Sequence, residues 1–374
     1  MPEFRGREIS IAFDLCGCPN RCRHCWLGKA SRKTIPLDEA ERVFREARQR
    51  VRDGAFLPWL ENVRHFGGHV REPHYCPEYK ALREKELELN AGTDYASDYE
   101  LLSVWRLARD PEYGKWAREI GVRRCQIALF GLGEVNDWFC RRKGAHADIL
   151  AATSRLLENG IAPRWQVFLN RKGLPDLEGI LHLAESLRLR ERCEAIGSPF
   201  QLFLNDWTPV GEARRHAHLR IALEEAARIP QEMILATEEF TGKPFVCTPE
   251  AEWITGMLQA EDRPIGVEEP PSHWLFLLPD GSVFPNVGSL EPWWRLGDFR
   301  REGLSAALAA FHADAVPALR AARSLTVHEA ARRYGDPRGQ RIYLSESDLR
   351  QLWLEKRCEA DTRPRPVGAP WRSA

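Results

Sequence analysis

The chain has 374 residues, long enough for a large catalytic domain and a smaller second one. Lys plus Arg and Asp plus Glu number 54 each, and this zero net charge argues against a nucleic-acid-binding protein, which usually carries a basic excess. The N-terminal MPEFRGREISIAF lacks the apolar core of a signal peptide, and no later apolar run is long enough to cross a bilayer. The sequence therefore predicts a soluble, cytoplasmic protein without a membrane partner.

The first half of the chain shows strand and helix patterns in alternation. We expect a buried strand at 7–15, an amphipathic helix at 37–53 that ends at Gly54, and a second strand at 62–68. A short helix near 77–89 follows, and a helical insertion is expected over about 85–120.

The alternation continues through the second half. Strands are expected at 125–131, 164–170 and 199–206, with helices over 149–160, 174–187 and 213–227. Residues 273–286 predict a hairpin around Asp280-Gly281, and helices follow to about Lys356. The tail 360–374, rich in Pro and Arg, is expected to be disordered. Such alternation predicts an α/β fold with a parallel sheet or open barrel, and a site at the C-terminal ends of its strands.

Ten cysteines are present, and four of them (Cys16, Cys18, Cys22 and Cys25) lie close together directly after the first strand. In a reducing compartment, clustered cysteines indicate metal ligands or reactive thiols rather than disulfides. Cys18-Pro-Asn-Arg-Cys22-Arg-His-Cys25 carries three thiols at x3 and x2 spacing, which suits a [4Fe–4S] cluster with one iron left open. The alternatives are a structural zinc loop with a distant fourth ligand and a disulfide pair.

This spacing resembles the signature of the radical S-adenosylmethionine (SAM) superfamily, which also follows a first strand. The resemblance implies that Cys18, Cys22 and Cys25 hold the cluster and that its open iron binds SAM. Reductive cleavage of SAM then gives a 5′-deoxyadenosyl radical that takes a hydrogen atom from substrate. His24 matches the position that lies beside the adenine, a role that Trp26 could share. Cys16 falls outside the pattern and is interpreted as a strand-end residue.

The segment after the second strand resembles the family's Gly-Gly-Glu-Pro motif, which holds the SAM amino group. Gly67 and Gly68 match the glycines. The carboxylate position is open: either His69 replaces it, or Glu72 is the equivalent after a local insertion. A simple strand-end turn is the alternative interpretation of the glycine pair.

Residues 125–161 resemble the branch of the superfamily that has SPASM or Twitch C-terminal domains. Asn136 falls in the matching acidic position, and Arg142 matches an arginine that could contact the SAM carboxylate. A solvated basic cluster is the alternative. The hairpin region 277–308 also resembles the auxiliary domain, but Asn286 stands where a cluster cysteine usually stands. We therefore expect the auxiliary cluster to be absent.

The resemblance implies a partial (β/α)6 TIM-like barrel with a small C-terminal α+β domain. The expected boundaries are 1–230 for the radical SAM domain and 231–359 for the SPASM/Twitch-like domain. Cys247 could be a catalytic hydrogen-atom donor, although a lone cysteine in an apolar stretch is more often a core residue. Cys76 and Cys140 have a similar but weaker claim.

The expected function is that of a radical SAM enzyme acting on a small polar metabolite, by epimerisation or another rearrangement. Without an auxiliary cluster, an oxidative outcome lacks its usual electron acceptor. The alternatives are radical modification of a ribosomally made peptide and a non-catalytic iron–sulfur scaffold. The expected cofactors are the [4Fe–4S] cluster and SAM, and the expected partner is a reductant such as flavodoxin or ferredoxin.

Overall fold

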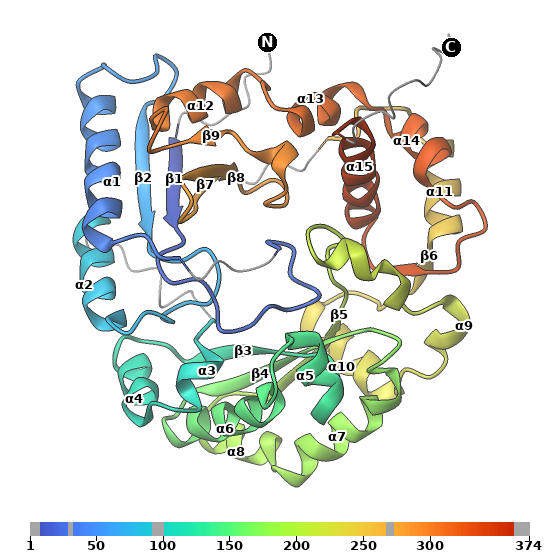
Figure 1. Cartoon of the computed structure of the whole chain (residues 1–374). Helices are drawn as coiled ribbons and strands as arrows, with labels where there is room; N and C mark the ends of the chain where they lie inside the picture. Colours follow the sequence, from blue (N-terminus) through green and yellow to red (C-terminus); the bar gives the residue numbers. More distant parts are fainter. Residues whose placement is uncertain (1–7, 29–32, 92–100, 267–272, 363–374) are drawn as a thin grey trace.

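The computed structural model describes residues 8–28, 33–91, 101–266 and 273–362 (Figure 1). Its strands form two main sheets, with order β2-β1-β7-β8-β9 in the first and β3-β4-β5 in the second. β1 is parallel to both β2 and β7, and β3, β4 and β5 are parallel to one another. The predicted α/β class with parallel strands is confirmed, although the described strands form two sheets instead of one continuous barrel sheet.

The strands are short. Their bounds are β1 Glu8–Phe13, β2 Asn62–Gly67, β3 Arg124–Leu129, β4 Ala162–Phe168, β5 Gln201–Asn205, β6 Thr248–Pro249, β7 His273–Leu277, β8 Ser282–Pro285, β9 Gly297–Asp298 and β10 Ile342–Tyr343. β1 is buried from Ile9 onward because it has a hydrogen-bonded strand on either side. β6 and β10 form a separate antiparallel pair.

The helices of the first half cover the outer faces of the sheets (Figure 1). Their bounds are α1 Leu37–Arg52, α2 Tyr79–Leu89, α3 Val104–Leu107, α4 Pro111–Glu119, α5 Gly133–Cys140, α6 Ala145–Glu158, α7 Leu177–Ser186 and α8 Leu189–Ala195, with a 3₁₀ turn, η1, at Leu174–Asp176. α1 buries Ala40, Phe44 and Ala47, as its apolar spacing predicts. α5 and α8 were not expected from the sequence.

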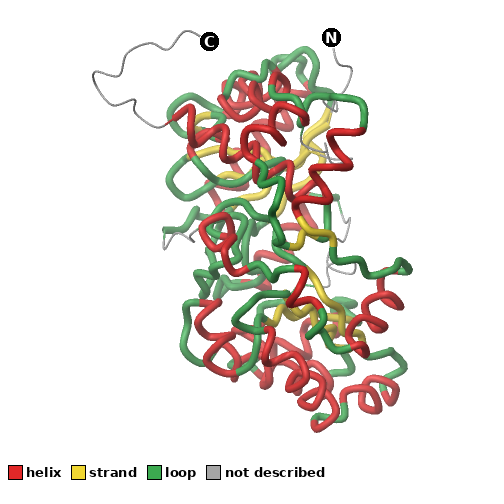
Figure 2. Tube along the Cα trace, turned by 90° about the vertical axis from the view of Figure 1, so that its right-hand side faces the viewer, coloured by secondary structure: helices red, strands yellow, loops and turns green. Residues whose placement is uncertain are grey.

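The second half is mostly helical. Its helices are α9 Leu223–Ala226, α10 Gln231–Thr241, α11 Glu250–Gln259, α12 Leu304–His312, α13 Pro317–Ser324, α14 Val327–Tyr334 and α15 Glu346–Thr362, with 3₁₀ helices η2 at Ala213–Leu219 and η3 at Pro292–Trp294. In Figure 1, α12, α13, α14 and α15 lie in the upper part of the molecule, and α10 lies in the lower part beside β5. The side view in Figure 2 shows strands in both the upper and the lower part. No helix among the described residues combines the length and apolarity needed to span a bilayer.

Two large hydrophobic clusters hold the chain together. One joins β1, β2 and α1 with residues of the C-terminal helices, and the other is built around β3, β4 and β5. The predicted hairpin at 273–286 is confirmed as β7 and β8, joined by a turn in which Gly281 has φ +90°. We call the loop 14–28, which follows β1 and contains Cys18, Cys22 and Cys25, the cysteine loop. β7 pairs with β1, so the C-terminal segment completes the sheet from which the cysteine loop emerges. The domain boundary near residue 230 stays a prediction.

Two expectations about helices were wrong. The segment 213–227 is not one helix: it bends at His216, and Arg220 is extended before α9 begins. The cause is Arg220 itself, whose buried guanidinium pairs with Asp206 and donates to the carbonyls of Trp207 and Ile342. The C-terminal tail also begins later than expected, because α15 continues to Thr362. Residues 363–374 lie outside the described part.

Candidate functional site

The cysteine loop follows β1 and is held from below by α5. The backbone N–H of Arg21 donates to the carbonyl of Cys140 at 3.2 Å, and that of Arg23 donates to the carbonyl of Phe139 at 2.8 Å. Cys18, Cys22 and Cys25 are free thiols and partly exposed. The last turn of α5 therefore fixes the loop that carries the three predicted ligands.

The surroundings of the three thiols raise the pKa of each above the usual value of a cysteine. Burial raises the pKa of Cys25 to about 11, against the opposing charge of Arg71, and burial raises that of Cys18 well above its usual value. The pKa of Cys22 is raised mainly by a hydrogen bond with the Cys140 thiol. Iron binding must therefore displace protons, as it does at other thiolate sites.

Among the described residues, no group of three His, Cys, Asp or Glu side chains converges on a single metal position. A cubane cluster does not require such convergence, because each cysteine binds a different iron. Three free thiols on one short loop are the donor set that such a cluster needs. The buried Nδ1 of His24 also has no hydrogen-bond partner among the described residues, so the loop holds a polar atom that a ligand could satisfy.

Arg71 was not singled out from the sequence, yet it fastens both ends of the cysteine loop. Its guanidinium pairs with Asp14 at 3.2 Å and donates to the carbonyls of Leu27 and Gly28 at 3.2 and 3.0 Å. It also lies 3.9 Å from the sulfur of Cys25. A charged residue in a loop belongs to no periodic pattern that would mark it as functional. The available signal for Arg71 was its position within the glycine-rich segment after β2.

Glu72 is the residue of that segment that lies at the cysteine loop. A carboxylate oxygen lies 4.0 Å from the sulfur of Cys18, and the other accepts a 3.0 Å hydrogen bond from the hydroxyl of Ser103. Burial raises the pKa of Glu72 to about 7. His69 is partly buried; burial lowers its pKa to about 4, and the centre of its ring lies 6.2 Å from that of His74.

The two glycines before His69 lie in close packing. A Cβ on Gly68 would lie 2.5 Å from the side chain of Leu82, and one on Gly67 would lie 3.1 Å from Trp274. The N–H of Gly68 donates to the carboxylate of Glu86 at 2.7 Å. The glycine pair thus lets β2 end against α2 and β7.

His24 points into an aromatic cluster. Its ring lies 4.3 Å from Phe130 and 5.1 Å from Phe168, and burial lowers its pKa to about 3, so the imidazole is neutral. Trp26 lies outside this cluster, 37% exposed and 6.1 Å from Phe276. The two residues therefore occupy different surroundings.

Asn136, on α5, holds the residue after β3, and Arg142, in the turn after α5, contacts the cysteine loop. Asn136 accepts from the N–H of Phe130 and donates to the sulfur of Cys140, at 3.1 and 3.8 Å. Arg142 donates to the side chain of Asn20 at 2.6 Å and pairs with Asp148. Arg142 is thus joined to the loop between Cys18 and Cys22.

The segment after β5 lies directly against the loop. Gly211 has φ +57°, and a Cβ there would lie 2.3 Å from the carbonyl oxygen of Trp26. The N–H of Glu212 donates to the carbonyl of Cys25 at 3.1 Å. Cys247 lies further along the chain, partly buried, with a pKa raised to about 11 by burial and then by Asp206. No hydrogen bond or ion pair within the described part of the chain joins Cys247 to the cysteine loop, and its role stays a prediction.

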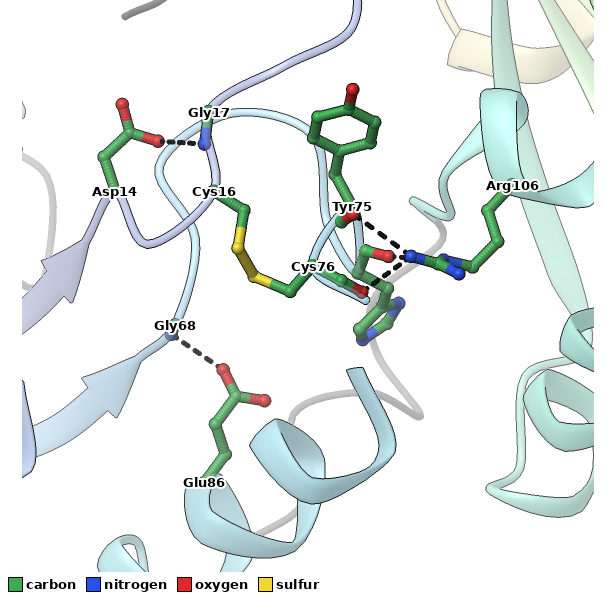
Figure 3. The surroundings of a disulfide bond; sticks show 9 residues. Asp14, Cys16, Gly17, Gly68, Tyr75, Cys76, Glu86 and Arg106 are labelled. Carbon is green, nitrogen blue, oxygen red and sulfur yellow. Dashed lines mark hydrogen bonds between the residues drawn. A yellow bond between two sulfur atoms is a disulfide. The ribbon is translucent and has the colours of Figure 1, made fainter. Parts of the chain in front are cut away.

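Cys16, one of the four clustered cysteines, and Cys76, one of the scattered ones, are not free. Cys16 and Cys76 form a disulfide that ties the end of β1 to the loop after β2 (Figure 3). The expectation that the cysteines are unpaired was wrong for these two, and Cys76 has no thiol hydrogen to donate. Arg106 holds the same loop by donating to the carbonyls of His74, Tyr75 and Cys76 at 2.8, 3.1 and 2.6 Å.

A cavity of about 740 Å³ lies away from the cysteine loop. Its lining comes from α7, α8, β5 and α10, and includes Arg190 and Leu235 but no residue of the cysteine loop. A second cavity of about 30 Å³ lies beside Gly67 and His69. The large cavity is therefore separate from the candidate site.

No protein-family model and no curated protein sequence matches this chain. The structure of native anSMEcpe with bound AdoMet is similar over 94% of this chain and 98% of its own, with 12% identity and a TM-score of 0.50. SuiB of Streptococcus suis bound to the precursor peptide SuiA matches 74% of this chain and 58% of its own, with 12% identity and a TM-score of 0.38. The Escherichia coli radical SAM enzyme coproporphyrinogen III oxidase (HemN) matches 77% and 68%, with 17% identity and a TM-score of 0.41. The first of these similarities supports the fold.

Proposed function

We propose that this chain is a radical SAM enzyme that holds a [4Fe–4S] cluster on Cys18, Cys22 and Cys25. The observation that carries the proposal is the loop after β1, where three free thiols at the spacing of the superfamily lie beside the Glu72 carboxylate. The fold similarity to a structure with bound AdoMet supports the same assignment. When bound, the cluster and SAM supply a 5′-deoxyadenosyl radical that removes a hydrogen atom from substrate.

The chain's own residues would position the cluster and bind SAM. Arg71 and Arg142 hold the loop in place through Asp14 and Asn20, so that the thiolates are positioned before the cluster binds. Glu72 offers a carboxylate to the SAM amino group, and neutral His24 offers the face of its ring and an unpaired nitrogen beside the adenine. These contacts would orient SAM and exclude water, which a reactive radical requires.

The proposed substrate is a small polar metabolite, and the proposed outcome is epimerisation or another redox-neutral rearrangement. Asn286 supports the redox-neutral outcome, because it has a structural task where an auxiliary cluster would need a thiolate. Its side-chain oxygen accepts from the N–H of Trp274 at 3.1 Å, and its own N–H donates to the Trp274 carbonyl at 3.0 Å. An amide does not replace a thiolate as an iron–sulfur ligand.

The test is an anaerobic reconstitution with iron and sulfide, followed by dithionite and SAM. We expect about four irons per chain, formation of 5′-deoxyadenosine, and loss of both in Cys22→Ala. Cys193→Ala is a matched control, because Cys193 is a buried thiol on α8. A full complement of iron without SAM cleavage would favour the scaffold alternative, and zinc in place of iron would exclude the proposal.

A further inference from the structure

Arg71 places a positive charge beside one of the three proposed cluster ligands. Nη1 of its guanidinium lies 3.9 Å from the sulfur of Cys25. The same nitrogen donates to the carbonyl of Gly28 at 3.0 Å, and Nη2 donates to the carbonyl of Leu27 at 3.2 Å. The contacts with the carbonyls hold the end of the cysteine loop, whereas the contact with sulfur brings the charge to the ligand itself.

Asp14 compensates part of this charge. Its Oδ2 accepts from Nε of Arg71 at 3.2 Å, and its Oδ1 accepts from the N–H of Gly17 at 3.2 Å, a bond drawn in Figure 3. The side chains of Arg71 and Asp14 are only 5% and 2% exposed, so water screens neither charge well. The cation is therefore in contact with both a buried carboxylate and the sulfur of Cys25.

Glu212 also lies near Cys25, because its backbone N–H donates to the Cys25 carbonyl at 3.1 Å. Its carboxylate pairs with Arg141 at 2.8 Å and with Arg215 at 2.9 Å. The negative charge of Glu212 is thus compensated by cations of its own, and Arg71 is left to act on the thiol.

A positive charge at a ligand sulfur makes an iron–sulfur cluster easier to reduce. Reduction adds one electron, and therefore one negative charge, to the cluster. Arg71 would stabilise the reduced form more than the oxidised form, and its effect would be strong because its surroundings are buried. Asp14 would oppose this effect, since its carboxylate neutralises part of the charge of Arg71 and repels the added electron.

We propose that Arg71 raises the reduction potential of the cluster on Cys18, Cys22 and Cys25, and that Asp14 limits the increase. The inference rests on the proposed function, because the cluster is the group that is reduced. A low-potential one-electron donor loses one electron and the cluster gains it; no bond forms or breaks and no proton moves. Arg71 acts through Cys25 and is therefore a positioning residue.

The test is an anaerobic potentiometric titration of the reconstituted protein with dithionite and redox mediators, followed by visible absorbance and electron paramagnetic resonance. In Arg71→Gln the equilibrium constant for reduction should fall about tenfold, which lowers the midpoint potential by about 59 mV. In Asp14→Asn, which keeps an oxygen for the N–H of Gly17, the constant should rise about tenfold. Arg71→Lys keeps the charge and should stay within about threefold of the wild type.

The opposite signs separate an electrostatic role from a structural one. Arg71→Gln and Asp14→Asn break the same ion pair, so a role limited to holding the loop would move both potentials in one direction. Shifts in the same direction, or shifts below about threefold in both variants, would overturn the inference. If Arg71→Gln binds no iron, Asp14→Asn decides: a higher potential supports the inference, and an unchanged or lower one overturns it.

Arg106→Gln is the matched control. Arg106 has an 11% exposed side chain and holds the loop after β2 by donating to the carbonyls of His74, Tyr75 and Cys76. Its loss should change the equilibrium constant less than about threefold, and a loss as large as that in Arg71→Gln would overturn the inference. A wild-type protein without a reducible cluster would overturn the proposed function and the inference together. A wild-type cluster whose potential does not respond to Arg71 or Asp14 would overturn the inference alone.

Discussion

The carboxylate of Glu72 lies 4.0 Å from the thiol of Cys18, although the two residues are 54 positions apart. The hydroxyl of Ser103 donates to the other carboxylate oxygen at 3.0 Å and fixes its orientation. The ring of His69, the competing candidate from the sequence, has its centre 6.2 Å from that of His74. We therefore propose Glu72 as the residue that would hold the SAM amino group.

We predict that Glu72→Gln weakens SAM binding about tenfold to a hundredfold, because a charged hydrogen bond contributes about 1.5–3 kcal/mol. His69→Gln, at a partly buried position of the same segment, should change the dissociation constant less than about threefold. Equilibrium dialysis with the reconstituted protein measures both, and iron content shows whether the cluster is intact. If His69→Gln weakened SAM binding more than Glu72→Gln, His69 would be the residue that holds the SAM amino group.

The Cys16–Cys76 disulfide gives a second prediction. It closes a loop of 60 residues, and removing such a cross-link costs about 4 kcal/mol of unfolding free energy through the entropy of the unfolded chain. A chemical count in denaturant should find eight free thiols before reduction and ten after it. Reduction should lower the unfolding temperature of the wild type. It should leave the unfolding temperature of the Cys16→Ser/Cys76→Ser variant unchanged. Ten free thiols before reduction would exclude the disulfide.

Glu86 provides a pH-dependent prediction. Burial raises its pKa from 4.5 to about 7, partly offset by the hydrogen bond from Gly68 and by Arg83. The folded protein therefore binds this proton more tightly than the unfolded chain does. The contribution of Glu86 is fully present below pH 4.5 and is lost as the pH rises through 7.

The variant that tests it is Glu86→Gln, which keeps an oxygen acceptor for Gly68. Relative to the wild type, its unfolding free energy should improve by up to about 3 kcal/mol between pH 4.5 and pH 8. Glu84→Gln, an exposed change on the same helix, serves as the control. Denaturant unfolding at several pH values measures the difference, and parallel pH profiles for Glu86→Gln and wild type would contradict the assignment.

The sequence predicted the parts of the fold that depend on local pattern. α1 follows from its apolar spacing, and β3, β4 and β5 follow from apolar runs that a buried parallel sheet requires. Their pairing partners were harder to predict. β7 joins β1 from the far end of the chain, and no local pattern encodes that contact.

In the candidate site, too, residues marked by a local pattern could be predicted, and residues that act through distant partners could not. The three cysteines were found because their spacing is itself the signal, and the glycine segment because it follows a strand. Arg71, Arg106 and the Cys16–Cys76 disulfide were missed, since each acts through partners that are distant in sequence. Arg220 shows the opposite error: a helical pattern gave way to a buried ion pair with Asp206.

Gly211 gives the last prediction, because it brings the segment after β5 against the cysteine loop. An added Cβ would lie 2.3 Å from the carbonyl oxygen of Trp26 and 3.0 Å from that of Cys25, and the backbone has φ +57°. Gly211→Ala must therefore displace either this segment or the loop, and we expect lower iron incorporation together with a loss of about 2–3 kcal/mol of stability.

Gly242→Ala separates the two effects. Gly242 ends α10 with φ +65°, and an added Cβ there meets nothing within 4 Å. This variant should lose about 1 kcal/mol through backbone strain alone and keep its full iron content. Iron per chain after anaerobic reconstitution and thermal unfolding of both variants provide the measurements. If Gly211→Ala bound as much iron as Gly242→Ala, backbone strain would account for the whole loss of stability in Gly211→Ala. Iron binding by the cysteine loop would then not depend on its contact with the segment after β5.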